Sequence, residues 1–269
     1  MQRAIGPIIF ALVYLLGTHP VLARDLVVRI EDSNMHLFVS GDGKPTIVLE
    51  AGFSGDHRTW DKVQDLLAAS ATVVSYDRLG AGQSEISKRP RTAEIIAEQL
   101  HLALAKAKLP PPYVMVGHSY GGPLVRVFSS MYKSEIAGIV LVDPAVEGFY
   151  VRASKEQPME YLNQLEEDLS WTEQQASNNA RREALAYETS MLQASLSKLP
   201  ANVPVVLLSA TKMHLPQALR AIWLDEQSVW AKTVGAQVTK VDSGHNIHRE
   251  RPELVLKAVS EILAVGRTP

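Results

Sequence analysis

The stretch YVMVGHSYGG (residues 113–122) sets one serine between glycines directly after an apolar run that is typical of a buried strand. An apolar helix pattern follows at Leu124, Val125, Val127, Phe128 and Met131. A strained strand-to-helix turn of the form G-x-S-x-G exposes its serine hydroxyl above the sheet. Gly117 and Gly121 fit such a turn because side chains there would meet the neighbouring strand or helix. The pattern arises by chance in roughly one chain of this length in ten, but this setting predicts that Ser119 is a nucleophile.

A serine hydroxyl needs a base to take its proton, and a histidine oriented by a carboxylate is the usual one. The segment VDSGH (residues 241–245) follows the last predicted strand and precedes the last helix. That order puts His245 on a loop at the same sheet edge as Ser119, and His245 is therefore the predicted base. His248, three residues on, lies too close to the next helix to be favoured. We expect His118 to pack against the turn or shape it.

Short β-rich runs alternate with helical patterns from Arg24 onward. The predicted strands cover residues 26–30, 35–39, 47–50, 73–76, 114–116, 139–142, 205–209 and 238–241. The first two are expected to form an antiparallel pair that turns at residues 32–34. The alternation predicts one α/β domain over residues 24–269, with a mostly parallel central sheet and helices on both faces.

Residues 147–199 interrupt this alternation because they contain no strand candidate. Leucines at helical spacing occupy positions 162, 165, 169, 185, 192 and 196. Thr172, with Gln175 three residues on, has the pattern of a capping box and predicts a helix start. We interpret the segment as a helical cap insertion over the carboxyl ends of the strands, where open α/β sheets bind ligands. A pair of ordinary packing helices is the alternative.

Composition limits the classes of partner and cofactor. The 269 residues include 27 basic and 29 acidic side chains, a net charge of −2 that gives no electrostatic footprint for nucleic acid or an anionic membrane. The absence of cysteine excludes disulfides, thiol catalysis and zinc–thiolate sites. The eight histidines form no HExxH or similar short ligand pattern. We therefore expect a small-molecule substrate, no metal and no cofactor.

The first 23 residues have the pattern of a signal peptide. Arg3 supplies positive charge, residues 5–16 form an apolar stretch, and Val21-Leu22-Ala23 puts small residues before a cleavage point. The apolar stretch is shorter than the ~20 residues that span a bilayer comfortably. The sequence thus predicts a secreted or periplasmic mature protein without an integral membrane span, with an uncleaved anchor as the alternative.

Five segments together resemble the ordered signatures of the α/β-hydrolase superfamily. They are LEAGF (49–53), YDRLGAGQS (76–84), GHSYGG (117–122), LVDP (141–144) and SGH (243–245). The chain is similar to the capped, esterase-like and peptidase-like members. Superfamily dehalogenases and epoxide hydrolases carry an aspartate at the position of Ser119, so the serine argues against those two chemistries.

The resemblance implies an oxyanion hole built from two backbone N–H groups, those of Phe53 and Tyr120. The family often has His-Gly in the first of these loops, whereas this chain has Ala51-Gly52, so the loop must be braced differently. The YDRLGAGQS loop is usually structural in the family. We assign it no chemistry and expect Asp77 to anchor it through backbone amides.

The carboxylate of the triad is the hardest residue to assign. In most members that the chain resembles, the acid follows the strand that matches residues 203–209, but the loop at 210–215 contains no acid. Some members place it one strand earlier, where Asp143 stands. We favour Asp143 over Asp225, which lies in a predicted helix, and Glu147 is a third choice.

These inferences predict an exported serine hydrolase that cleaves a small carboxylic ester through an acyl-enzyme on Ser119. One alternative is an amidase or aminopeptidase, in which cap carboxylates such as Glu156, Glu160, Glu166 or Glu167 receive a substrate ammonium. Another is a ligand-binding protein of the same fold that has lost turnover.

Overall fold

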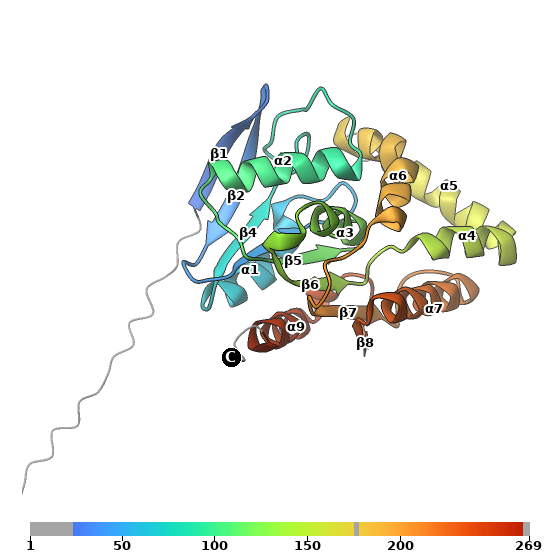
Figure 1. Ribbon diagram of the computed structural model, residues 1–269. Helices are drawn as coiled ribbons and strands as arrows, with labels where there is room; N and C mark the ends of the chain where they lie inside the picture. Colours follow the sequence, from blue (N-terminus) through green and yellow to red (C-terminus); the bar gives the residue numbers. More distant parts are fainter. Residues whose placement is uncertain (1–23, 175–177, 266–269) are drawn as a thin grey trace, which may run out of the picture.

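An eight-stranded sheet forms the centre of the described part of the protein (Figure 1). The computed structural model describes residues 24–174 and 178–265. The strands are β1 (Arg24–Ile30), β2 (Ser33–Ser40), β3 (Thr46–Glu50), β4 (Thr72–Tyr76), β5 (Tyr113–His118), β6 (Ile136–Val142), β7 (Val205–Ala210) and β8 (Gln237–Val241). Their order across the sheet is β1-β2-β4-β3-β5-β6-β7-β8. β1 and β2 pair antiparallel, as do β2 and β4, and all later neighbours are parallel.

Helices cover both faces of the sheet (Figure 1). They are α1 (Asp61–Ala68), α2 (Ala93–Lys106), α3 (Gly121–Met131), α4 (Glu147–Glu156), α5 (Pro158–Gln174), α6 (Asn178–Leu196), α7 (Gln217–Val234), α8 (Ile247–Glu250) and α9 (Pro252–Val265), with short 3-10 turns η1 (His57–Trp60) and η2 (Lys133–Glu135). α2 and α3 pack on one face, and α1 and α9 pack on the other. The expected mostly parallel α/β architecture is confirmed.

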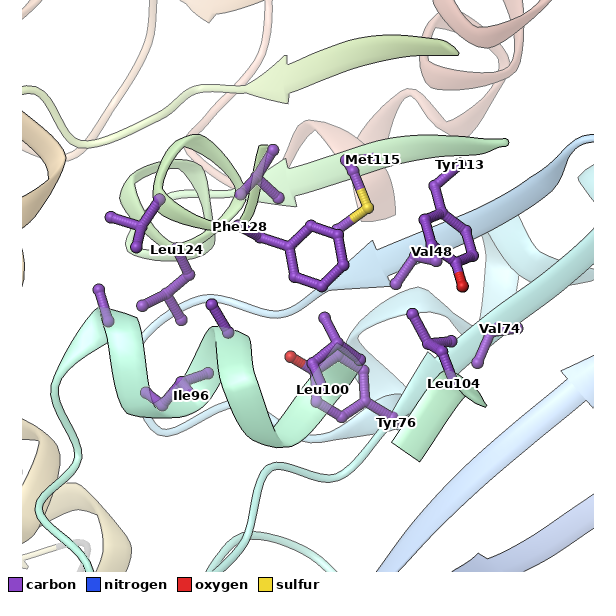
Figure 2. Packing of buried hydrophobic residues seen from close by; sticks show 14 of the residues in the cluster. Val48, Val74, Tyr76, Ile96, Leu100, Leu104, Tyr113, Met115, Leu124 and Phe128 are labelled. Carbon is purple, nitrogen blue, oxygen red and sulfur yellow. The ribbon is translucent and has the colours of Figure 1, made fainter. Parts of the chain in front are cut away.

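The core beneath α2 follows directly from its apolar spacing. Ile96, Leu100 and Leu104 recur every fourth residue and are at most 2% exposed. Figure 2 shows these side chains gathered with Met115 of β5 and Phe128 of α3. Burial of one such side chain stabilises the fold by about 1.5–3 kcal/mol, so this layer fixes β5, and with it the turn that follows β5.

The eight expected strands all form, but the first turn is shorter than predicted. Ile30 pairs with Ser33, which leaves only Glu31 and Asp32 in the turn rather than residues 32–34. Glu31 has a φ of 54°. Two-residue hairpin turns use such positive φ values because their twist matches that of the strands they join.

Three helices, α4, α5 and α6, occupy the segment between β6 and β7 in which no strand was expected. The predicted helix start at Thr172 is wrong, because Thr172 lies inside α5. Its hydroxyl donates to the Asp168 carbonyl at 2.7 Å. Threonine can satisfy its hydroxyl in this way within a helix, so its presence need not mark a cap.

The three inserted helices differ in their attachment to the rest of the fold. α4 packs against α7, and α6 packs against α2 and α3, whereas α5 packs against α4 and α6. The leucines that predicted these helices are exposed, with Leu162 at 50% and Leu185 at 88%. Along residues 24–174 and 178–265, no helix has the length and apolarity needed to cross a membrane. The predicted signal peptide, residues 1–23, lies outside the described residues.

Candidate active site

Ser119 occupies a strained turn at the carboxyl end of β5. Its φ of 52° lies in the left-handed region, which costs a non-glycine residue of order 1–3 kcal/mol. The turn is held by backbone bonds, because the Ser119 amide donates to the Val142 carbonyl at 3.1 Å and its own carbonyl accepts from Gly122 and Ala145 at 2.9 and 3.0 Å. These bonds fix the serine where β5 meets α3.

The glycines on either side of this turn are required by close packing. A Cβ on Gly117 would lie 2.5 Å from the Gly121 carbonyl oxygen. A Cβ on Gly121 would lie 2.6 Å from the backbone carbonyl oxygen of Glu50 and 2.7 Å from that of Ala51. The crowding expected from the sequence is thus present, and it brings the turn against the loop after β3.

His245 and Asp143 meet at the carboxyl edge of the sheet. The His245 Nδ1 lies 2.6 Å from the Asp143 Oδ2, although 102 residues separate them in the chain. Asp143 is fully buried directly after β6, and its φ is 44°. Because Nδ1 donates to the carboxylate, Nε2 is left with a lone pair that can accept a proton.

The second oxygen of Asp143 is held by three further donors. Oδ1 accepts from the Ala210 amide at 3.1 Å, the Trp223 indole at 3.0 Å and the Gln227 amide nitrogen at 3.0 Å. Gln227 in turn donates to the Pro144 carbonyl at 2.9 Å. The orientation of the carboxylate is therefore set by α7 and by the last residue of β7.

The other two candidate acids point to different partners. Asp225 is 57% exposed on α7 and pairs with Arg152 of α4. Glu147 pairs with Arg126 at 2.9 Å. Within the described part of the chain, neither carboxylate bonds to His245, so the geometry brings only Asp143 of the three to this histidine.

Two further histidines lie behind His245. The rings of His118 and His245 are 4.6 Å apart, and those of His118 and His248 are 4.3 Å apart. Burial, together with the facing His245 and His248 rings, holds the pKa of His118 well below its usual range. Burial also lowers the pKa of His248 to about 3. Both rings are therefore neutral at neutral pH.

His118 supports the loop that carries His245. Its Nε2 lies 3.1 Å from the carbonyl oxygen of His245, a contact beyond the turn that His118 was expected to pack against or shape. No hydrogen bond joins the Ser119 hydroxyl to His245 in the described residues. Catalytic hydrogen bonds of this kind often close only when substrate is bound.

The loop after β3 lies directly against Ser119. A Cβ on Gly52 would be 3.4 Å from the Ser119 Cβ. Phe53, the next residue, packs against Tyr120 and Tyr187 with ring centroids 6.0 and 6.2 Å apart, and against Trp171 of α5 at 6.5 Å. Aromatic side chains from two inserted helices therefore gather beside the serine.

A buried ion cluster braces this loop, and the sequence analysis missed it. Arg78 pairs with Glu50 and with Glu183 of α6, each at 2.7 Å, and all three side chains are at most 2% exposed. Arg78 had no predicted role beyond its loop, and Glu183 had no predicted role. A glutamate at the end of the apolar strand TIVLE was the available signal, because a buried charge requires a partner.

Asp77 anchors its own loop, as expected. It accepts from the backbone amides of His57 at 2.9 Å and Gln83 at 2.8 Å. Asp77 also lies beside Asp56 and His57. Each of the three residues offers one possible metal-ligand atom, and these atoms lie within 4.8 Å of one another. Arg58 binds both oxygens of Asp56, so these groups already have protein partners.

Comparison with known proteins places the chain among hydrolases. Residues 45–204, more than half of the chain, match the family model described as "alpha/beta hydrolase fold". The "Uncharacterized protein YqjL" of Bacillus subtilis (strain 168) is 27% identical over 240 residues, covering 82% of this chain and 85% of that protein.

Two solved structures show the same fold at low sequence identity. The enol-lactonase from Burkholderia xenovorans LB400 has a TM-score of 0.60 at 19% identity, covering 89% of this chain and 100% of that one. The haloalkane dehalogenase DatA from Agrobacterium tumefaciens C58 has a TM-score of 0.66 at 15% identity, covering 90% and 97%. Because these neighbours differ in chemistry, the fold alone does not choose a reaction.

Proposed function

Because the chain belongs to the alpha/beta hydrolase fold family, we propose that it is a serine hydrolase that cleaves small carboxylic esters. Ser119 is the nucleophile, His245 the general base and then acid, and Asp143 the carboxylate that orients the histidine. The backbone N–H groups of Phe53 and Tyr120 form the oxyanion hole.

The reaction follows from the roles of these groups. His245 Nε2 takes the hydroxyl proton while Ser119 Oγ attacks the ester carbonyl carbon, and the new oxyanion accepts hydrogen bonds from Phe53 and Tyr120. Collapse of the tetrahedral intermediate expels the alcohol, which receives the proton from His245. Water, deprotonated by the same nitrogen, then attacks the acyl-enzyme and releases the acid.

One observation carries this proposal: the 2.6 Å bond between His245 and a fully buried Asp143 at the sheet edge where Ser119 follows β5. A buried carboxylate is costly unless hydrogen bonds satisfy it, and three donors bind Oδ1 of Asp143. Here the donors leave one oxygen for the histidine, which suits an imidazolium that forms during reaction.

Substrate size follows from the aromatic groups near the serine. Phe53, Tyr120 and Tyr187 pack on one another, and the Tyr150 and Tyr187 hydroxyls bond to each other. We take α4, α5 and α6 as a cap over the site, so these rings bound the space for an acyl group and favour small soluble esters.

The chemistry is tested with a panel of p-nitrophenyl esters of increasing acyl length, run beside aminoacyl anilides. Wild-type protein is expected to hydrolyse the short esters in preference to the anilides, and Ser119→Ala is expected to lose nearly all hydrolysis while keeping its fold. Faster turnover of the anilides would replace the ester assignment with an amidase or aminopeptidase.

Export is proposed on the sequence alone. Arg3, the apolar residues 5–16 and Val21-Leu22-Ala23 support cleavage after Ala23 and a secreted or periplasmic mature protein.

A further inference from the structure

The planar peptide unit between Gly52 and Phe53 carries both a carbonyl and the proposed oxyanion donor. Arg78 Nη2 donates to the Gly52 carbonyl at 2.7 Å, and the Gly55 amide donates to the same oxygen at 3.1 Å. In a trans peptide the N–H points opposite to the C=O. Holding the Gly52 oxygen therefore sets the direction in which the Phe53 N–H points.

The peptides on either side of this unit are held by the same cluster. Arg78 Nη1 donates to the Ala51 carbonyl at 2.9 Å, and the Ser54 amide donates to Glu183 Oε2 at 2.8 Å. Ser54 has a φ of 52°, a strained value that needs support from its surroundings. Three successive peptide units thus depend on Arg78 and Glu183.

The position of Arg78 depends in turn on its two carboxylates. Glu183 binds the guanidinium through Nε at 2.7 Å and Nη2 at 3.1 Å, and Glu50 binds Nη1 at 2.7 Å. Burial would raise the pKa of Glu183, but Arg78 lowers it below its ordinary value. Glu183 is therefore the ionised partner whose two hydrogen bonds fix the orientation of the planar Arg78 guanidinium.

Glu183 belongs to α6, which is fastened to the core by other contacts as well. Arg182 Nη2 donates to the Arg89 carbonyl at 2.7 Å, and the Tyr120 hydroxyl donates to Ser190 at 2.9 Å. Figure 1 shows α6 beside α2 and α3, while α5 lies farther out. α6 is thus the inserted helix that packs on α2 and α3.

We propose that Glu183 is a positioning residue for the oxyanion hole: through its bonds to Arg78 and Ser54, it sets the aim of the Phe53 amide. This inference rests on the proposed function for its effect on turnover. It gives the inserted helix a part in the chemistry itself, because a side chain of α6 then supports the donor that holds the oxyanion.

The kinetic test compares Glu183→Gln with Arg182→Gln on p-nitrophenyl acetate. Losing one oxyanion donor outright costs about 10²–10³ in kcat, so a loosened donor in Glu183→Gln should lower kcat about tenfold to a hundredfold, with KM within about threefold. Arg182→Gln removes the bonds from the neighbouring side chain of α6 to the Ser87 and Arg89 carbonyls but leaves Glu183 and its partners unchanged, and should keep kcat within about threefold. Equal kcat losses in the two variants would overturn the proposal.

A second measurement does not require turnover. Hydrogen exchange of the amides in residues 52–55 should become at least about tenfold faster in Glu183→Gln, while amides of β7 exchange as in wild type. If wild-type protein hydrolyses no ester and Glu183→Gln still exchanges faster at residues 52–55, the proposed function is refuted and the loop support stands. Unchanged exchange at residues 52–55 would refute the support itself.

Should Glu183→Gln fail to fold by circular dichroism, Arg78→Lys supplies the same test. Lysine keeps the buried positive charge but lacks the planar fork that reaches two carboxylates and two carbonyls. The expected result is again a lower kcat with faster exchange at residues 52–55, and wild-type values of both would contradict the proposal.

Discussion

Asp143 Oδ2 and His245 Nδ1 lie 2.6 Å apart, joined across 102 residues of chain at the ends of β6 and β8. The other carboxylate oxygen accepts from Ala210, Trp223 and Gln227. The fold thus holds a fully buried acid in one orientation, with a single oxygen left for the histidine.

Replacing Asp143 by asparagine should cut kcat by ~10⁴, because the amide no longer holds the imidazole in the productive tautomer or stabilises the imidazolium. Asp225→Asn is the matched control, since Asp225 is 57% exposed and pairs with Arg152. Surface changes of this kind usually alter stability by at most about 0.5 kcal/mol. Steady-state kinetics on one ester measures both variants. Loss of turnover in Asp225→Asn, with Asp143→Asn still active, would move the acid to α7.

His248 should make the folded protein sensitive to acid. Its pKa is lowered to about 3 by burial, whereas an unfolded histidine titrates near 6.5. Between these values the unfolded chain binds a proton that the native chain does not, so stability falls as pH falls. From pH 7 to pH 5 this group alone costs about 2 kcal/mol.

His248→Phe should remove that part of the pH dependence. The ring packs between Trp60 and His118, and neither nitrogen has a partner in the described residues, so an apolar ring of similar size fits the site. Urea unfolding at pH 7 and pH 5 measures the difference, and His118 contributes in the same direction in both proteins. An identical pH dependence in wild type and variant would contradict a neutral buried His248.

Export predicts a mature N-terminus at Arg24. Arg3, the apolar residues 5–16 and Val21-Leu22-Ala23 before the cleavage point motivate this prediction. Intact-mass analysis of the secreted or periplasmic protein measures it directly. Recovery of a chain that starts at Met1 from a membrane fraction would favour an uncleaved anchor.

The sequence predicts the strands well because they are short apolar runs between polar turns. β5, read from YVMV, and the glycine-flanked turn after it are local features that need no distant partner. Chain order also placed His245 at the sheet edge of Ser119, since parallel strands bring their carboxyl ends to one edge. Asp143 was favoured over Asp225 because some members of the family that the chain resembles carry the acid one strand earlier.

Long-range polar contacts could not be predicted in this way. Arg78 and Glu183 lie 105 residues apart, on a loop and on an inserted helix, and no periodicity relates them. The predicted helix start at Thr172 was wrong because a threonine can cap the start of a helix or donate its hydroxyl to a carbonyl within one. The helical spacing of the leucines in α5 and α6 predicts helices, but does not say which face another element covers.

The most direct test of the account is covalent labelling with a fluorophosphonate probe, followed by peptide mapping. The probe phosphonylates a serine only where a base and an oxyanion hole activate it. We expect one added phosphonyl group on Ser119 in wild type, and none in Ser119→Ala. A folded wild-type protein without modification at Ser119 would contradict it and favour a binding protein of the same fold.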